Sequence, residues 1–425
     1  MKIQIKSEPI SPFSGVSFVN NYFDKIGMTQ LIDSELGDRV RLTGYNYGEI
    51  FRNLTNVFLS GGDRIEDINT HLGEHLNRIP DNTAPSADTV LRAIKELSTS
   101  NTGYQSNSGI RYDFNINEKL NKLNIKSLLL TKQLISGQGY DFDYDNQVMP
   151  NNKYDAKMTY KKVKGYFPGI ATMGDKVVYV ENRDGNANVK FKQADTLSRA
   201  YELLDAENIK VNRSRMDAGS YSKEIIDVVS RHSKLFYIRA NKSEALLKKI
   251  KGATNWQAVE INYINYEVAS IPFSQFFEDR NYRLVIMRER RADNQGDLFT
   301  GDAFRYRSIL TNDIESDEKA IIEYYNQRGA SEKTFDIMNN DFGWKHLPFS
   351  FQNENGAFMI ITSMVKNFYN FFVGIVSRVF DGINPNTRLK RFIFRFISVA
   401  GKWVYQGRRW VLKLYTGQPY DKLII

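Results

Sequence analysis

The sequence predicts an α/β fold in which a mixed sheet is preceded by a helical N-terminal region and interrupted by a β-rich insertion. Three observations predict it. Apolar residues recur with helical spacing through residues 1–97, strand and helix patterns alternate over 139–240, and strand-like runs fill 251–311. With 425 residues, 41 % of them hydrophobic, the chain can bury the cores of two or three domains.

Composition narrows the possible partners. The chain has 58 Lys and Arg against 49 Asp and Glu, a net charge of +9, which favours a polyanionic partner without identifying one. It has no cysteine, so disulfides, thiolate zinc sites and cysteine nucleophiles are excluded, and a reducing cytoplasm is expected as the location. The N-terminal residues show no apolar segment of a signal peptide.

The best candidate for a membrane span is residues 358–380. Polar and charged residues recur in it with helical spacing, at Lys366, Asn367, Asn370 and Arg378. Lipid would not tolerate them, so we predict a core helix with one polar edge and no membrane partner.

Residues 1–97 are expected to form a helical N-terminal DNA-binding domain. "YNYGEIFRNLTNVFLSGG" aligns apolar residues on one stripe and stops at a glycine pair. "APSADTVLRAIKEL" places Ser86 as an N-cap and leaves Arg92 and Lys95 on the polar face. This helix has two interpretations: the DNA-reading member of a helix pair, with Arg92 at the DNA, or an ordinary amphipathic helix.

The polar stretch 98–114 is predicted to be a linker, and 115–425 the second domain. A helix is expected near 115–134. Three strands follow, and then helix, strand, helix and strand up to residue 240. This order is that of the ribonuclease-H-like fold, with the insertion 251–311 and a helix returning from about 315.

"DFDYDNQ" in the first of these strands places Asp141, Asp143 and Asp145 on one face. Their mutual repulsion predicts a positive partner in front of that face. Two later acids stand where the local pattern does not require them, Asp217 after a strand and Glu332 in the late helix.

In the late helix Tyr325, Arg328 and Glu332 stand at i, i+3 and i+7 on one face, a spacing that a plain surface ion pair also explains. "YNQRGASEKTFDIMN" resembles the Y-x2-R-x3-E-x6-K signature of bacterial insertion-sequence transposases of the DDE class. "DYDNQ" and "RMDAGSYS" precede it in the family's order. "SGGDRIEDI" and "GKWVYQGRRWVLKL" resemble flanking segments of the same group.

The resemblance implies a metal-binding catalytic triad of Asp145, Asp217 and Glu332, with Asp143 as the alternative first acid. It implies that Tyr325 and Arg328 hold the DNA strand. Asn339 stands where the signature has a Lys that holds a DNA phosphate, a role that Lys333 or Lys345 could take over.

The implied reaction is cut-and-paste transposition in a ribonuclease-H-like catalytic domain. Two Mg²⁺ or Mn²⁺ ions about 4 Å apart would assist cleavage at the element ends by stabilising the attacking and leaving oxygens. The freed 3′-OH would then join target DNA. The partners would be double-stranded DNA, as terminal inverted repeats and target, and a second copy in a homodimer. The alternatives are a transposase-derived DNA-binding protein without catalysis and a ribonuclease-H-like nuclease that only hydrolyses.

Two further regions have open interpretations. Trp256 in the insertion could stack on an unpaired base or pack in the core. The basic C-terminal segment 382–425, which includes Arg408 and Arg409, could follow DNA phosphates or pack with a solvated basic edge.

Overall fold

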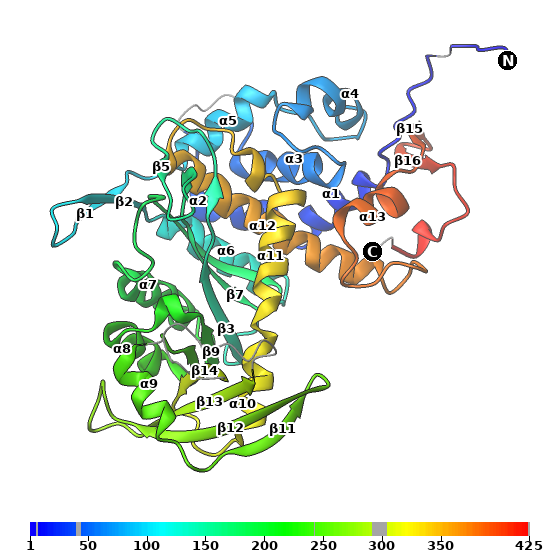
Figure 1. Cartoon of the computed structure of the whole chain (residues 1–425). Helices are drawn as coiled ribbons and strands as arrows, with labels where there is room; N and C mark the ends of the chain where they lie inside the picture. Colours follow the sequence, from blue (N-terminus) through cyan, green and yellow to red (C-terminus); the bar gives the residue numbers. More distant parts are fainter. Residues whose placement is uncertain (6, 40–43, 242, 291–303, 424–425) are drawn as a thin grey trace.

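The computed structural model describes the chain except residues 6, 40–43, 242, 291–303 and 424–425. Helices of the N-terminal and C-terminal regions lie together at one end of the molecule, and the insertion lies at the other (Figure 1).

Eleven strands of the described chain form one sheet, in the order β1-β2-β8-β7-β3-β9-β10-β14-β13-β12-β11. In its middle, β8, β7 and β3 are antiparallel, and β9 and β10 run parallel to β3. These five are β3 (Gly139–Asn146), β7 (Gly169–Met173), β8 (Lys176–Arg183), β9 (Lys210–Met216) and β10 (Ser233–Arg239). Numbered along the chain, their spatial order is 3-2-1-4-5, which is the ribonuclease-H-like order and confirms the predicted fold class.

Helices cover this sheet. Phe142 and Tyr144 of β3 point into a core completed by α7 (Gln193–Ala206) and α8 (Lys223–His232). The Phe142 ring lies 4.6 Å from the ring of Tyr201 on α7, centroid to centroid. Two further helices contact β8, namely α6 (Glu118–Leu130) and α12 (Gln352–Val376).

The N-terminal region is helical, as predicted. Its helices are α1 (Val16–Lys25), α2 (Met28–Leu36), α3 (Tyr47–Leu59), the short π-helical turn η1 (Ile68–Leu72), α4 (Gly73–Leu76) and α5 (Ala87–Glu96). The side chain of Asn46 caps α3 in a capping box, and the Ser86 side chain accepts the Thr89 N–H to cap α5. These helices share one apolar core with α12, so this region does not form a separate core of its own.

The prediction that residues 98–114 form a linker is wrong for most of this stretch. Residues there form a hairpin of β1 (Thr102–Gln105) and β2 (Arg111–Asn115), and β2 joins the main sheet beside β8. The polar composition belongs to the turn between the two strands. The strands are fixed by aromatic packing, because the Phe114 ring contacts the rings of Tyr104 and Phe191, a contact that local composition does not reveal.

α12 is a core helix, as predicted. It is the helix of the described chain that is long and apolar enough to cross a membrane, but most of its apolar stretch is buried against β8, α6, α3 and α5. Its polar side chains bond to the neighbouring strand. Asn367 bonds to both backbone groups of Val177, and Lys366 donates to the carbonyl of Asp175.

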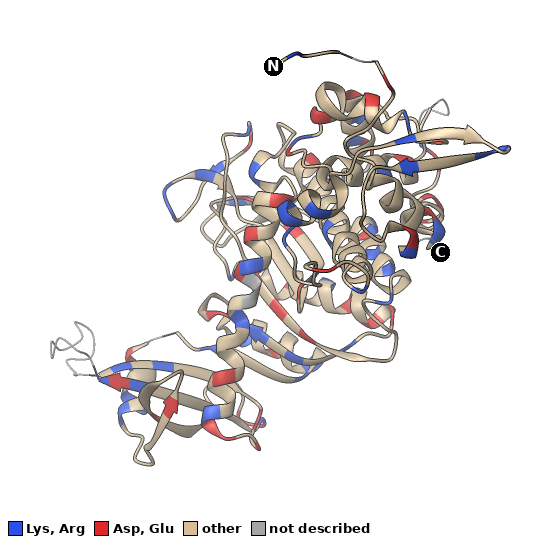
Figure 2. Cartoon of the chain, turned by 90° about the vertical axis from the view of Figure 1, so that its right-hand side faces the viewer, with Lys and Arg blue, Asp and Glu red and all other residues tan. Residues whose placement is uncertain are grey.

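The region 251–311 is β-rich, as predicted. After α9 (Glu244–Lys251) it contains β11 (Gln257–Ile261), β12 (Ile264–Phe273), β13 (Tyr282–Arg290) and β14 (Phe304–Thr311). β14 pairs with β10, so the insertion extends the main sheet. The polar segment "ADNQGDLFTGD" (292–302), whose composition predicts a turn, lies outside the described residues. Figure 2 shows residues of both charge signs spread over the insertion.

A helical segment leads from the insertion back to the N-terminal helices (Figure 1). It consists of α10 (Glu318–Asn326), a 3-10 turn η3 (Gln327–Gly329) and α11 (Ala330–Asp341). The late helix predicted from the sequence is therefore two helices with a tighter turn between them.

Residues 147–167, which we call the ledge, form a small sheet of β4 (Met149–Pro150), β6 (Lys164–Tyr166) and β5 (Lys157–Met158). The chain ends with α13 (Leu389–Phe392), the π-helical turn η5 (Ile393–Ile397) and a hairpin of β15 (Gly401–Gln406) and β16 (Arg409–Leu414). Short 3-10 turns are η2 (Ala218–Ser220), η4 (Trp344–His346) and η6 (Tyr420–Leu423).

Candidate active site

Each of the three aspartates on β3 has an arginine partner. Arg213 and Arg215 stand opposite Asp141 and Asp143 in the parallel pairing of β3 with β9. Arg213 Nη2 lies 2.6 Å from Asp141 Oδ2, and Arg215 donates to both carboxylate oxygens of Asp143 at 2.7 Å. For these two acids the expected positive partner is therefore an arginine and not a metal ion, because the register of β9 aligns the charges.

Asp143 is buried and forms an ion pair with Arg215 inside the fold. It is 3 % exposed, and burial raises the pKa of its carboxyl although Arg215 acts in the opposite direction. Arg215 also donates to the carbonyl of Tyr324 on α10 at 2.9 Å, so the pair ties β3, β9 and α10 together. This favours Asp145 over Asp143 as the first acid of the predicted triad.

Asp145 lies two residues further along β3, in a cleft of about 950 Å³. Its Oδ2 accepts a hydrogen bond from Arg328 Nη1 at 2.8 Å, and its Oδ1 accepts the N–H of Asn146 at 2.9 Å. Burial raises the pKa of Asp145, as does the negative charge of Asp217, whereas Arg328 lowers it. Asp145 and Asp217 are thus close enough to affect each other.

Asp217 directly follows β9. Its side chain accepts the N–H of Gly219 at 2.8 Å and so caps the 3-10 turn η2. A Cβ at residue 219 would lie 2.9 Å from Asp217 Oδ1 and 3.1 Å from the side chain of Val189, so the close approach favours glycine there. This turn holds the second carboxylate at the cleft.

Glu332 stands exposed in the first turn of α11 and lines the same cleft, together with Arg328 on the 3-10 turn before it. Tyr325 lies deeper. Its hydroxyl donates to the carbonyl of Met216 at 3.2 Å, which fixes the end of α10 beside Asp217. The predicted common face therefore holds for Arg328 and Glu332, while Tyr325 supports them from behind.

The three predicted acids therefore come from a strand, a turn and a helix to one cleft. Carboxylate oxygens are the hard ligands that Mg²⁺ prefers, and the guanidinium of Arg328 shows that a positive charge is accepted beside Asp145. In the part of the chain that the structure describes, no three His, Cys, Asp or Glu side chains stand close enough together to hold one ion. The donor chemistry fits a divalent cation, and the ion pair of Arg328 would have to open to admit it.

The opposite wall of the cleft holds residues that the sequence analysis missed. Tyr160 and Lys161 of the ledge line it, and the Tyr160 ring packs edge-on against Phe167, 5.6 Å between centroids. Tyr160 is 71 % exposed. The segment "KMTYKKVKGY" combines lysines with tyrosines, a pattern that could have indicated a nucleic-acid contact. Only the folding of the ledge brings Tyr160 and Lys161 opposite the acids.

The position of the missing signature lysine lies apart from this wall. Asn339 is half-buried on α11, a helical turn beyond Phe335, which does line the cleft. Lys333 and Lys345, the predicted substitutes, line two other clefts.

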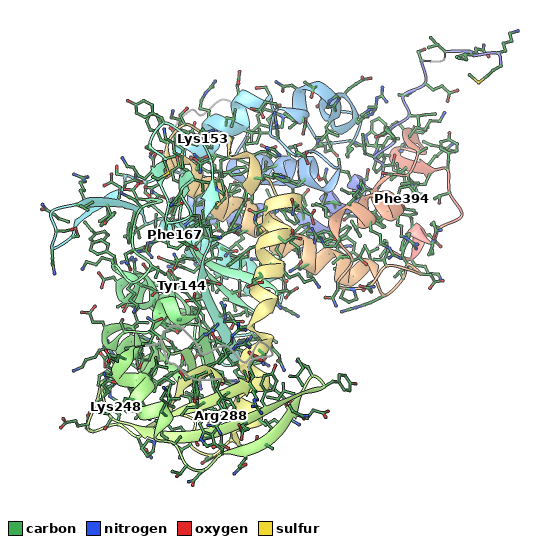
Figure 3. All side chains as sticks on the ribbon, viewed as in Figure 1. Tyr144, Lys153, Phe167, Lys248, Arg288 and Phe394 are labelled. Carbon is green, nitrogen blue, oxygen red and sulfur yellow. The ribbon has the colours of Figure 1, made fainter. Side chains whose placement is uncertain are left out.

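The remaining predicted DNA contacts are dispersed. Trp256 donates to the carbonyl of Ala253 at 2.8 Å, and the guanidinium carbon of Arg288 lies 3.9 Å from its ring centroid, which favours the packing alternative. Figure 3 shows Arg288 on the insertion, at the opposite end of the molecule from Lys153 on the ledge. Arg92 is exposed on α5, a placement compatible with both interpretations of that helix.

Arg408 and Arg409 are exposed at the turn of the β15–β16 hairpin, where Arg408 has a φ of 63°. Arg409 lines a separate cleft beside the rings of Trp403 and Trp410. The C-terminal segment therefore combines a packed apolar side with an exposed basic turn, and both interpretations of it stand.

Comparison with known proteins assigns the family. Residues 2–425 match the family described as transposase DDE domain group 1. A solved piggyBac transposase, in a synaptic complex with hairpin DNA, aligns with 89 % of this chain and 78 % of its own, at 12 % identity and a TM-score of 0.43. No curated protein matches. Since the family match spans nearly every residue and includes all three acids of the cleft, the chain belongs to the DDE transposase family, domain group 1.

Proposed function

We propose that the protein cuts the ends of its insertion sequence and joins the freed 3′-OH to target DNA by phosphoryl transfer. The observation that carries the proposal is the convergence of Asp145, Asp217 and Glu332 on one cleft beside Arg328. Phosphoryl transfer needs positioned positive charge at the entering and leaving oxygens, and a cleft of carboxylates provides the ligands for it.

Once the Arg328–Asp145 pair opens and the three carboxylates draw closer together, they would hold two Mg²⁺ or Mn²⁺ ions, which supply an activated water and stabilise charge on the reacting oxygens. The chain itself positions the acids. β3 fixes Asp145, and the N–H of Gly219 orients Asp217. Glu332 enters from α11, so the packing of α10 and α11 sets the separation of the third acid from the other two.

Arg328 has a second task in this proposal. In the structure its guanidinium pairs with Asp145. Burial lowers the pKa of Arg328, but Asp145, Tyr325 and Asp217 raise it by more, so the pKa lies above its ordinary value. The group stays protonated. When DNA enters, the guanidinium can exchange the carboxylate for a phosphate, a bidentate partner of similar geometry. Tyr325 would then keep the turn that carries Arg328 in place.

The partners in this proposal are the double-stranded terminal repeats and the target DNA. A homodimer would hold the two ends, and the reaction would take place in the bacterial cytoplasm. The net charge of +9 supports DNA as the partner, since it favours association with a polyanion.

The test uses purified protein and a duplex carrying the inverted repeat that flanks its own gene, with Mg²⁺ or Mn²⁺. We expect cuts at the repeat end that disappear in Asp145→Ala, Asp217→Ala and Glu332→Ala, while DNA binding persists. Near-normal cutting by one variant would remove that acid from the triad.

The same assay separates the alternatives. Cutting without joining to a target plasmid would identify a nuclease that only hydrolyses. Binding without cutting by the unmodified protein would identify a DNA-binding protein, and Asn339→Lys would then be the first reversion to try. No structural observation favours either alternative over the transposase.

A further inference from the structure

A second cleft, of about 550 Å³, is bordered by another stretch of the ledge. Its lining includes Arg64, Lys153, Lys345 and His346 and one carboxylate, Glu66. Among the described residues, none of the three cations forms an ion pair, and the one carboxylate of the cleft, Glu66, acts on Lys153 without pairing with it. A concave surface with this excess of positive charge suits an anion.

Arg64 is positioned by a turn, within the motif "SGGDRIEDI" to which the proposed chemistry assigns no role. Asp67 Oδ2 accepts the N–H groups of Asp63 at 2.8 Å and of Arg64 at 3.0 Å. A Cβ at residue 62 would lie 2.7 Å from the side chain of Val57, so the turn packs tightly on α3. The motif therefore builds a rigid support for one basic side chain at the cleft.

Lys153 is positioned from the ledge. Its N–H donates to Asn151 Oδ1 at 3.1 Å, the N–H of Asn151 donates to the carbonyl of Lys164 at 3.0 Å, and the N–H of Tyr154 donates to the carbonyl of Ser350 at 3.0 Å. The Lys153 side chain is half-buried, and burial lowers its pKa, while the negative charge of Glu66 acts in the opposite direction. An anion at this place would restore the interactions that the ammonium group loses from water.

The ledge connects the two clefts. Its residues 158–161 line the acid cleft and its residues 150–153 line the second one. It carries Lys157, Lys161, Lys162 and Lys164 as exposed side chains. Its acid, Asp155, is occupied by hydrogen bonds from the hydroxyl of Tyr166 at 2.5 Å and the N–H of Gln352 at 2.7 Å. A polyanion that crosses the ledge between the two clefts would therefore meet exposed lysines and no free carboxylate of the ledge.

We propose that the cleft lined by Arg64, Lys153 and Lys345 binds backbone phosphates of the same DNA whose scissile phosphate lies in the acid cleft. The inference rests on the proposed function for the identity of that DNA. Contacts to phosphates position a nucleic acid without reading its sequence. Asn339 on α11 cannot provide the positive charge of the signature lysine. The second cleft would provide positive charge instead, at a different place on the DNA.

The experiment measures binding of the full chain to the inverted-repeat duplex without divalent metal, as a function of salt concentration. Each lost phosphate contact makes the slope of log K against log salt less negative by about one. We expect this change in Lys153→Met and in Lys345→Met, with affinity at low salt reduced on the order of tenfold. Lys153→Arg should retain the slope. Lys122→Met, at an exposed lysine on α6, is the matched control and should behave as the unmodified protein.

Neutral methylphosphonates placed singly along the duplex locate the contact. A position that weakens binding to the unmodified protein, but not to Lys153→Met, marks the phosphate that Lys153 holds. We expect such a position to one side of the cut. The inference would be overturned if both methionine variants kept the slope of the unmodified protein while circular dichroism showed intact folding. It would also be overturned if the coupling between Lys153→Met and the methylphosphonates were the same at every position of the duplex.

Failure of this inference and failure of the proposed function give different results. Metal-dependent cutting at the repeat end with unchanged slopes would leave the transposase activity and remove the second cleft from it. Reduced slopes in a protein that never cuts DNA would support the second cleft and overturn the catalytic proposal.

Discussion

Two ion pairs on one strand, Asp143–Arg215 and Asp145–Arg328, have the same chemistry and different surroundings. Asp143 and Arg215 are 3 % and 8 % exposed, and their strands are hydrogen-bonded neighbours. Asp145 and Arg328 are 18 % and 17 % exposed at a cleft, and Arg328 reaches β3 from a 3-10 turn far along the chain. The first pair is fixed by the sheet, while the second depends on how α10 and α11 pack.

The difference shows how one Asp-x-Asp segment serves both fold and function. A buried pair that loses one member leaves an uncompensated charge, so it is costly to break. A pair at a cleft can exchange its arginine for another cation or its carboxylate for a phosphate with little loss of buried contacts. Alternation along β3 thus places the buried acid Asp143 and the acid to which we assign metal binding, Asp145, two residues apart.

The largest effect expected from this comparison is on cleavage. Asp145→Asn should reduce the rate of metal-dependent cutting by about a thousandfold or more, because an amide is a poor ligand for a hard divalent ion. The unfolding free energy should change little, since the cleft hydrates the freed Arg328. Gel-based cleavage and urea unfolding measure the two quantities. Asp141→Asn, at the half-buried pair with Arg213, is the control and should still cut.

Asp143→Asn should show the opposite pattern. The buried Arg215 would lose its counter-charge, and we expect the unfolding free energy to fall by about 3 kcal/mol. The double variant Asp143→Asn with Arg215→Met should regain part of that loss, since no buried charge remains. Chemical denaturation of the four proteins measures the coupling. If Asp143→Asn left stability intact and abolished cutting at a low temperature where it is folded, Asp143 and not Asp145 would be the first acid.

Much of this arrangement follows from the sequence, and the reasons are local. The strand carrying Asp145, the turn carrying Asp217 and the helix carrying Glu332 were each predicted from periodicity and motif, and the family resemblance joined them into one site. The partners of Asp141 and Asp143 were not predictable in the same way. Their arginines lie 72 positions away along the chain and meet them only through the register of β9 against β3.

Two other features were missed for a similar physical reason. The hairpin at 102–115 looked like a linker because its turn is polar, whereas its aromatic residues gain their packing from Phe191. Lys161 received no role from the sequence, where it stands in a lysine-rich run. Its place opposite the acids depends on the ledge being held to the sheet, as by the bridge between Tyr166 and Asp184. Long-range packing decides such cases, and local composition does not report it.

Arg328 provides a smaller and more specific test of the cleft pair. Arg328→Met removes the cation that competes for Asp145, so Mn²⁺ should bind the DNA-free protein about tenfold more tightly, a gain of about 1.4 kcal/mol. Cutting should nevertheless slow, because the phosphate loses its guanidinium partner. Electron paramagnetic resonance of free Mn²⁺ measures the affinity. Unchanged affinity in this variant would show that the pair does not compete with metal.

The last test concerns a buried acid with no arginine. Asp184 follows β8 at the base of the ledge, is 3 % exposed and accepts the N–H of Asp113 at 2.9 Å. Among the described residues no arginine forms an ion pair with it, and burial raises its pKa from 3.8 to about 6. This is the environment that Asp143 would have without Arg215.

The sign of the pH dependence follows from that shift. The folded state holds the Asp184 proton more tightly than the unfolded chain, so the carboxyl's contribution is favourable below about pH 4 and is lost as the pH rises through about 6. An amide cannot ionise and can still accept the Asp113 N–H. Asp184→Asn should therefore match the unmodified protein near pH 4 and exceed its unfolding free energy above pH 6 by about 1–2 kcal/mol. Urea unfolding at several pH values measures the difference. A gain that is the same at every pH would mean that ionisation of Asp184 is not its source, and that burial without an arginine costs this fold less than the contrast between Asp143 and Asp145 implies.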